Sequence, residues 1–320
     1  MHPWNEPILE ALKKRERLPH AILLHGPRGV GKLELAERMA QLLLCEHAEL
    51  AQRPCGRCDG CRWYLAGNHP DFRRLEPEAI AKLPPPMEEE EGSSAEAPAR
   101  RTKQPSIVIT VDQVRELADF LNIGSHRGKL RIALVHPAED MNANAANALL
   151  KGLEEPPAGA IFILVSHRPA RLLPTVRSRC VAIPVPIPPR EVSLAWLAAE
   201  GAANPERWLA FAGGAPLQAL DYATEAAGWE RLLKSPTAVD GREDLERLAE
   251  ALQKIAYDRA FSAFGLPPKY RTGTPASTPK ARPWLTYARK MGENRILTRH
   301  PLNPRLFSSE MLVEMENASS

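Results

Sequence analysis

The sequence predicts an α/β domain built on a parallel sheet, followed by a region that is helical throughout. In the first half of the chain, short aliphatic segments alternate with amphipathic helices, as a parallel sheet with helical crossovers requires. After a proline-rich stretch at 184–189, apolar residues recur only at helical spacing. The 320 residues, 44% hydrophobic and 25% charged, suffice for two or three domains.

Five segments are predicted as buried strands because they are short, aliphatic and bounded by turn residues. They are Ala21–Leu24, Ile107–Ile109, Arg131–Val135, Ile161–Val165 and Val181–Val185. Helices between them have clear entry signals: Thr110 and Gln113 form a capping box, and Asn142 is placed to cap the next helix. Residues 83–105, with prolines and consecutive glutamates, are predicted to form a mobile surface insertion without an assigned function.

The helical region is expected to begin near residue 190 and to continue to the end of the sequence. Its predicted helices are Glu191–Glu200, Pro205–Phe211, Pro216–Glu225, Arg242–Phe264 and Trp284–Met315, the last with a break around Pro301–Pro304. We expect domain boundaries that give three parts, 1–185, 186–235 and 236–320.

A phosphate-loop pattern lies between the first strand and a helix over Glu34–Leu44. Gly26, Gly31 and Lys32 match G-x-x-x-x-G-K, whose backbone N–H groups surround phosphate oxygens. The next position should be Ser or Thr, because that hydroxyl binds Mg²⁺, but it is Leu33. The sequence therefore predicts a degenerate loop that does not support ATP hydrolysis.

A second acidic motif is also missing. The strand Arg131–Val135 should end in carboxylates that hold Mg²⁺, but His136-Pro137 follows. Glu139 and Asp140 lie three or four residues past the strand, and we expect their side chains to point elsewhere.

Four of the five cysteines fall within seventeen residues. Cys45, Cys55, Cys58 and Cys61 have the spacing C-x9-C-x2-C-x2-C, which suits a structural, tetrahedral Zn²⁺ with no open position. An iron–sulfur cluster shares part of this spacing and stays open as an alternative. Buried cysteines without a metal are disfavoured because the segment is hydrophilic.

A short connection, Ser178-Arg179-Cys180, directly precedes the last predicted strand. An arginine fixed there is suited to reach a phosphate across a subunit boundary, whereas Arg171 and Arg177 are interpreted as solvated surface residues.

Taken in order, the phosphate loop, the cysteine insertion, the run from Ala145 to Pro157 and Ser178-Arg179-Cys180 resemble bacterial clamp-loader subunits of DNA polymerase III, an AAA+ family. The likeness is strong over about 15–185. It implies a RecA-like AAA+ domain, a helical lid and a C-terminal helical collar. It also implies that Arg179 acts in trans on ATP bound to an adjacent subunit, and that Cys45, Cys55, Cys58 and Cys61 bind zinc. Residues 214–217, Gly-Ala-Pro-Leu, stand where active relatives have a lid arginine.

The resemblance implies partners as well: tau/gamma ATPase subunits and delta in a hetero-pentamer, with the sliding clamp and primer-template DNA reached through the complex. The chain itself is expected not to be an enzyme, although it would be part of the DNA-directed DNA polymerase holoenzyme. Alternatives are an autonomous AAA+ ATPase of helicase-loader type, and a zinc-dependent DNA-binding regulator that uses Arg53, Arg57 and Arg62.

The N-terminal residues lack the basic and apolar regions of a secretory signal, and no apolar run reaches the ~18 residues of a membrane helix. We therefore expect a cytoplasmic protein without a membrane segment. The net charge of +3 is too small to indicate nucleic-acid binding by itself.

Overall fold

The computed structural model describes residues 1–15, 17–81, 105–123, 130–273, 280–298 and 302–319. The chain divides into two compact units, one of residues 1–27 and 31–186, the other of residues 28–30 and 187–320. The insertion predicted at 83–105 lies almost entirely outside the described residues.

The first unit contains a five-stranded sheet in which all paired strands are parallel. Its strands are β1 (Ala21–His25), β2 (Phe72–Leu75), β3 (Arg131–Val135), β4 (Ala160–Ser166) and β5 (Val181–Pro184). The order across the sheet is β2-β3-β4-β1-β5. The central strands β3 and β4 are buried along their whole length, which explains their unbroken aliphatic sequences.

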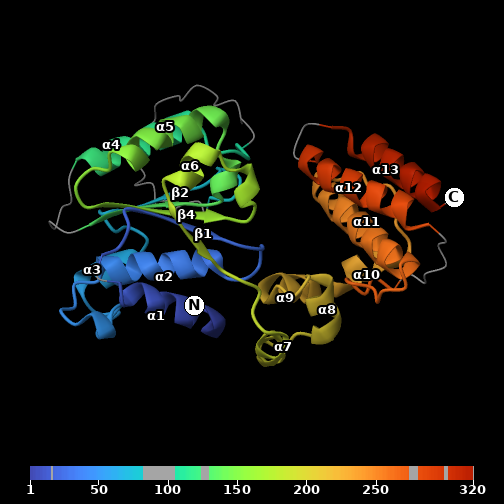
Figure 1. Ribbon diagram of the computed structural model, residues 1–320, viewed down its shortest axis with the longest axis horizontal. Helices are drawn as coiled ribbons and strands as arrows, with labels where there is room; N and C mark the ends of the chain where they lie inside the picture. The colour runs from blue at the N-terminus through green and yellow to red at the C-terminus, as the bar shows by residue number, and fades with distance from the viewer. Residues whose placement is uncertain (16, 82–104, 124–129, 274–279, 299–301, 320) are drawn as a thin grey trace, which may run out of the picture. The chain divides into compact units, whose positions relative to one another are not determined.

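Helices cover both faces of this sheet (Figure 1). On one face lie α1 (Glu6–Lys13), α2 (Lys32–Leu44) and α3 (Asp59–Leu65), and on the other α4 (Val111–Asn122), α5 (Ala143–Glu154) and α6 (Pro174–Ser178). Short 3-10 turns occur at Pro3–Asn5, Leu50–Gln52, Ala138–Asp140 and Pro169–Arg171. The predicted α/β fold class is confirmed.

The predicted helix caps of the first unit are present. Thr110 and Gln113 form the capping box of α4, and Asn142 Oδ1 accepts a hydrogen bond of 2.8 Å from the Ala145 N–H at the start of α5. The strand predicted at Ile107–Ile109 is wrong, because only Ile109 forms a bridge there, to Met141. The strand at that edge of the sheet is Phe72–Leu75, which was not predicted.

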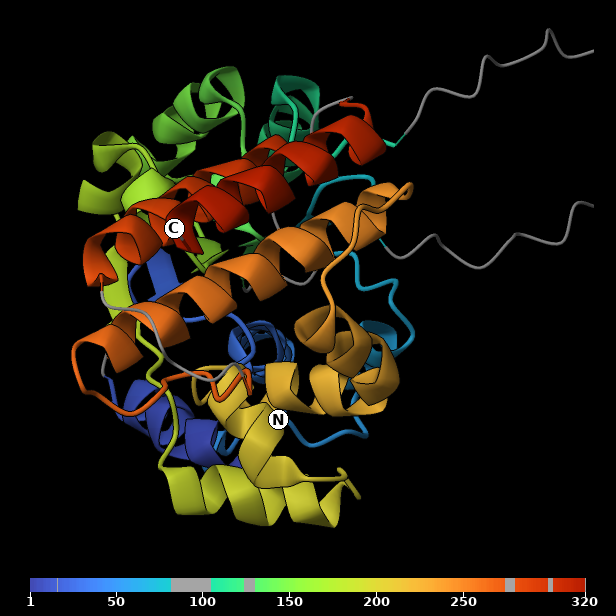
Figure 2. The same ribbon diagram turned by 90° about the vertical axis from the view of Figure 1, so that its right-hand side faces the viewer.

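Every regular element in the described part of the second unit is a helix. Its helices are α7 (Arg190–Ala199), α8 (Pro205–Phe211), α9 (Pro216–Thr224), α10 (Ala226–Lys234), α11 (Arg242–Ala263), α12 (Ala281–Leu297) and α13 (Pro304–Ser319). The long helices α11, α12 and α13 lie side by side (Figure 2). The predicted break near residues 301–304 separates α12 from α13, and α10 was not predicted.

Two apolar clusters stabilise this unit. One joins α11, α12 and α13 around the fully buried Trp284 and Met311. The other packs α7–α10 against α11 and centres on Trp208, Phe211 and Trp229. Helix α11 therefore contributes to both clusters. None of the helices described is both long and apolar enough to cross a lipid bilayer.

Candidate metal centre, phosphate loop and arginine site

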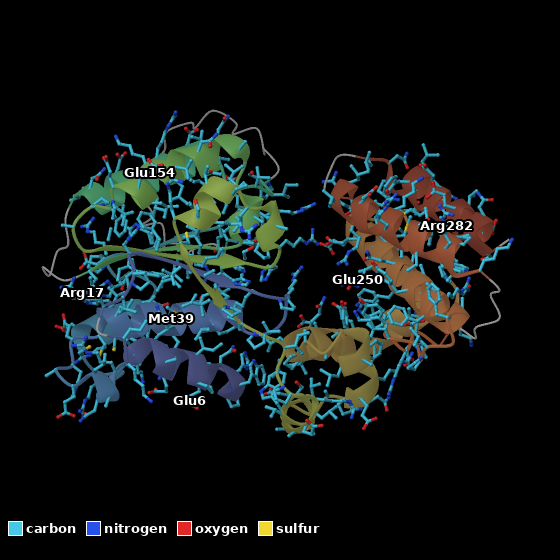
Figure 3. All side chains as sticks on the ribbon, in the orientation of Figure 1. Glu6, Arg17, Met39, Glu154, Glu250 and Arg282 are labelled. Atoms are coloured by element: carbon cyan, nitrogen blue, oxygen red, sulfur yellow. The ribbon has the colours of Figure 1, made fainter. Side chains whose placement is uncertain are left out.

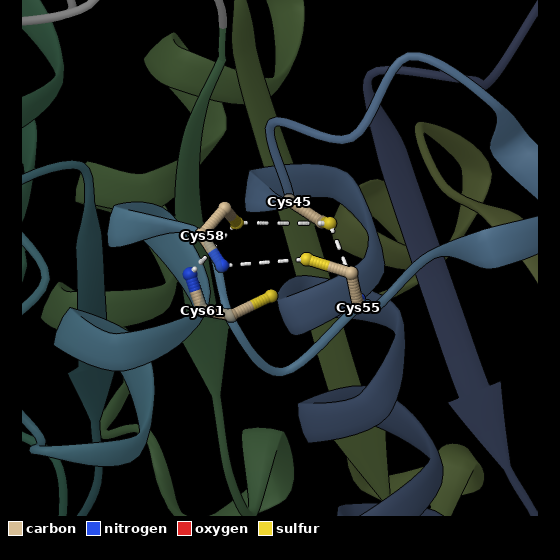
Figure 4. A group of neighbouring side chains, drawn as sticks. All are labelled: Cys45, Cys55, Cys58 and Cys61. Atoms are coloured by element: carbon tan, nitrogen blue, oxygen red, sulfur yellow. Dashed lines mark hydrogen bonds between the residues drawn. The ribbon is translucent and has the colours of Figure 1, made fainter.

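The four clustered cysteines converge on one point (Figure 4). Their sulfur atoms all lie within 4.8 Å of one another, and the Cys45 and Cys58 sulfurs are 3.9 Å apart. Four thiolates around a tetrahedral zinc, each at ~2.3 Å, lie about 3.8 Å from one another. The cluster therefore fits a metal ion such as zinc, with four sulfur ligands and no further ligand needed.

Backbone N–H groups point at these sulfurs and favour thiolates. The N–H groups of Glu46 and Cys61 each lie 3.4 Å from the Cys58 sulfur, and the N–H of Cys55 lies 3.4 Å from the Cys45 sulfur. Hydrogen bonds from the backbone N–H groups of Arg57 and Cys58 lower the pKa of Cys55 to about 6. Burial raises the pKa of Cys61 to about 12, so this thiol needs a cation to become a ligand.

Local structure brings the four ligands together. Cys45 ends α2, whereas Cys58 caps α3 and accepts from the Cys61 N–H. Gly60 makes the close approach of the two helices possible, because a Cβ at this position would lie 2.5 Å from the Leu44 carbonyl oxygen.

Two of the three arginines near the cluster bind its own backbone. Arg53 Nε donates to the His47 carbonyl at 2.6 Å, and Arg62 Nε donates to the Arg57 carbonyl at 3.0 Å. The side chains of Arg53 and Arg62 therefore stabilise the loop itself. This weakens the hypothesis that the loop binds nucleic acid.

The phosphate loop begins where β1 ends, and its first glycine is required sterically. Gly26 has φ +155°, and a Cβ there would lie 2.2 Å from the Val185 carbonyl oxygen. Lys32 is buried, and its ammonium donates to the carbonyl of Pro27 within the same loop. Asn5 Nδ2 donates to the Gly31 carbonyl at 3.0 Å. Protein groups thus satisfy both the loop's lysine and one of its carbonyls.

The metal-binding oxygens of an ATPase are absent from the expected positions. Leu33, in the first turn of α2, has no oxygen to offer, and β3 is followed by His136. His136 Nε2 lies 3.2 Å from Nε2 of His167, which follows β4. Glu139 Oε1 accepts the His167 backbone N–H at 2.9 Å, so this carboxylate is engaged at the end of β4.

Arg179 follows α6 and is held by two oxygens of its own unit. Its Nη2 lies 2.5 Å from Glu154 Oε1, and its Nη1 donates to the Thr175 carbonyl at 3.0 Å. The Arg179 side chain remains 34% exposed. Sequence reasoning had singled out Arg179 but had given Glu154 no role.

The neighbours of Arg179 have structural roles in this conformation. The Ser178 hydroxyl donates to the Thr175 carbonyl at 3.1 Å. Cys180 packs against the core of the first unit, and burial raises the pKa of its thiol to about 11. It is therefore a poor nucleophile near neutral pH. In the second unit, the predicted lid substitutions at 214–217 lie at the start of α9, where Ala215 is buried.

The model of the family "DNA polymerase III, delta subunit" matches residues 4–188. The DNA polymerase III subunit delta' of Pseudomonas aeruginosa is 42% identical over 223 residues, covering 68% of this chain and 60% of that protein. Its Escherichia coli counterpart is 31% identical over 256 residues, covering 72% of this chain and 69% of that protein.

These matches are partial in length. The chain spans 60% of the Pseudomonas protein and 51% of the Yersinia pestis delta' subunit, to which it is 35% identical. Among solved structures, a gamma-subunit-related protein of Thermotoga maritima aligns with 98% of this chain and 99% of its own, at 18% identity and a TM-score of 0.45.

Proposed function

Because this chain belongs to the DNA polymerase III delta subunit family, and within it resembles the delta' subunits, we propose that it is a clamp-loader subunit that does not hydrolyse ATP. In this role it helps to load the sliding clamp onto primed DNA and supplies Arg179 to ATP bound by a neighbouring subunit. The proposal depends above all on one observation: a partly exposed arginine is fixed at a domain surface while the chain's own phosphate loop lacks its metal ligands.

Two features of the loop support the absence of ATP hydrolysis. Phosphoryl transfer needs Mg²⁺ between the β- and γ-phosphates, held by a hydroxyl after the loop lysine and by a carboxylate at the end of a neighbouring strand. Leu33 and His136 occupy these two positions. In addition, Lys32 already has an acceptor in the Pro27 carbonyl, so its ammonium is hydrogen-bonded without a phosphate.

Arg179 has the properties of an arginine that acts in trans. Its guanidinium offers five N–H donors, of which one donates to the Thr175 carbonyl and another belongs to the nitrogen paired with Glu154. The remaining donors are available to the oxygens of a phosphate. Such an arginine stabilises the charge that spreads over the transferred phosphoryl group in the transition state.

The metal at Cys45, Cys55, Cys58 and Cys61 is proposed to be a structural zinc. When bound, zinc would cross-link the end of α2 to the start of α3 and would neutralise the thiolates. All four ligands are sulfurs, so no position is open for water or a substrate. The cluster therefore contributes stability rather than chemistry.

The remaining parts of the proposal follow from the resemblance to clamp-loader subunits. The chain would assemble with tau/gamma-type ATPase subunits and a delta subunit, and would reach DNA and the clamp through that assembly in the cytoplasm. Residues 186–235 would form the lid and 236–320 the collar of the AAA+ arrangement. Helices α11–α13, the longest in the described part of the second unit, would belong to this collar.

The test compares Arg179→Ala with Arg177→Ala in the reconstituted assembly. Arg177 is a suitable control because it lies in α6, which Arg179 directly follows, and is exposed. We expect Arg179→Ala to lower the DNA-stimulated ATP hydrolysis of the assembly by about tenfold or more, and Arg177→Ala to leave it near the wild-type rate. Equal rates for the two variants and the wild type would rule out the trans role.

A further inference from the structure

We propose that Glu154 is a positioning residue, which holds the Arg179 guanidinium in the orientation that the neighbouring subunit uses. This inference rests on the proposed function, because it concerns the arginine assigned to act in trans. Glu154 belongs to the run Leu-Glu-Glu-Pro-Pro at 153–157, for which the proposed function supplies no other use.

The contact is a close ion pair, and a hydrogen bond to a backbone carbonyl lies beside it. Glu154 Oε1 lies 2.5 Å from Arg179 Nη2, while the Thr175 carbonyl accepts from Arg179 Nη1 at 3.0 Å. The two acceptors therefore bind the two terminal nitrogens of one planar group. Two such contacts fix the plane of the guanidinium, which a single contact would leave free to rotate.

Both sides of the contact are anchored in the core of the first unit. Glu154 is the last residue of α5 (Figure 3) and directly follows Leu153, which is 1% exposed. Arg179 caps α6, whose Val176 is fully buried. Because the backbone on each side is set by packed residues, the distance between the carboxylate and the guanidinium depends on the packing of α5 against α6.

Positioning matters here because an arginine side chain has several rotatable bonds. An unrestrained guanidinium visits many rotamers, and each assembly event would have to select one of them at an entropic cost. Glu154 restricts these rotamers before the neighbour arrives. The pair is partly exposed, at 34% for Arg179 and 47% for Glu154, so water screens it and its effect is expected to be moderate.

The experiment is a double-mutant cycle in the reconstituted assembly. The variants are Glu154→Gln, Arg179→Ala and the combination, and Glu155→Gln is the matched control. Glu155 is the adjacent, exposed carboxylate, and among the described residues it forms no ion pair. For each assembly, kcat and KM for ATP are measured under DNA and clamp stimulation, together with the melting temperature of each isolated chain.

We expect Glu154→Gln to lower kcat about two- to fivefold, with KM and melting temperature unchanged, since an exposed pair contributes an amount of this order. Glu155→Gln should match the wild type. In the Arg179→Ala background, Glu154→Gln should have no further effect, because a positioning residue acts only through the side chain that it positions.

The possible failures can be told apart. If Arg179→Ala leaves kcat unchanged, the trans role itself is wrong, and the role of Glu154 falls with it. If Arg179→Ala lowers kcat while Glu154→Gln has no effect or raises it, the trans role stands and the positioning role is overturned. A rise in kcat would show that Glu154 inhibits the action of Arg179. An equal loss from Glu154→Gln in both backgrounds would also refute positioning.

Discussion

A buried charged cluster in the second unit yields a quantitative stability prediction. Glu250 on α11 accepts the Tyr222 hydroxyl, lies 2.8 Å from Lys254 Nζ through Oε1, and lies 3.2 Å from Arg295 Nη2 through Oε2. Lys254 also lies 3.9 Å from the centre of the Phe211 ring. The cluster thus joins α9, α11 and α12 through one carboxylate, and we expect Glu250→Gln to destabilise the unit.

The pKa of Glu250 gives the size and the sign of this effect. Burial alone would raise the pKa, but the charges of Lys254 and Arg295 outweigh burial and lower it from the ordinary 4.5 to about 2. At ~1.36 kcal/mol per pKa unit, this difference corresponds to about 3 kcal/mol of stability at pH 7. Because the folded-state pKa is the lower one, this stability is present above pH 4.5 and is lost as the pH falls through 2. At pH 3, about 1 kcal/mol remains.

Removal of the carboxylate also leaves a buried cation behind. Even beside Glu250, burial lowers the pKa of Lys254 to about 8. In Glu250→Gln the ammonium loses its nearest counter-charge, so its pKa should fall further and the side chain should lose its proton more readily. For this reason we expect Glu250→Gln to lower the free energy of unfolding by about 3 kcal/mol. This is the lower end of the ~3–5 kcal/mol observed when one partner of a buried ion pair is removed.

The measurement is urea unfolding of the full chain at pH 7 and pH 3, followed by circular dichroism and tryptophan fluorescence. Glu225→Gln is the control, because Glu225 forms a 2.8 Å pair with Arg247 in the same unit, but at the surface. The control should lose about 0–1 kcal/mol. The reasoning fails if Glu250→Gln is no less stable than the control at pH 7, or if its deficit grows at pH 3.

Two further predictions concern the metal centre and the phosphate loop. Cys58→Ser should lose bound zinc, measured by elemental analysis of the purified chain, and its cysteine loop should become sensitive to protease. The control Cys180→Ser should retain about one zinc per chain. Equal zinc contents in the two variants would contradict the assignment of Cys58 as a ligand. Leu33→Thr should bring no ATP turnover to the isolated chain, because a carboxylate is still missing at His136. Measurable turnover in a phosphate-release assay would contradict this, because it would show that the hydroxyl was the only group missing for hydrolysis.

Most strands of the sheet were predictable because strands that are buried on both faces have runs of aliphatic residues. Arg131–Val135 was predicted with the bounds that the structure has, since β3 is buried along its whole length and the four residues after Arg131 are aliphatic. Phe72–Leu75 was missed because β2 is an edge strand, in which Arg73 is exposed and Arg74 pairs with Glu37 and Glu76. Its sequence therefore lacks the aliphatic pattern, which Ile107–Ile109 has without being a strand.

The candidate sites also differ in how much of each could be predicted from the sequence. The convergence of the four cysteines could be predicted because they are closely spaced, with one at the end of a helix and three in the following loop and the start of the next helix. The pairing of Glu154 with Arg179 could not, because it depends on how α5 packs against α6. The engagement of Lys32 by the Pro27 carbonyl also required coordinates, since the sequence alone shows an intact loop lysine.

In the proposed role, this chain serves a neighbour's ATP site and has no turnover of its own. The most direct measurement is magnesium-dependent ATP hydrolysis by the purified chain alone, and by the partner ATPase subunits before and after the chain is added. We predict no turnover above background alone, a marked rise on adding the wild-type chain, and little rise on adding Arg179→Ala. Turnover by the lone chain that Lys32→Ala abolishes, or an equal rise with both chains, would contradict the account.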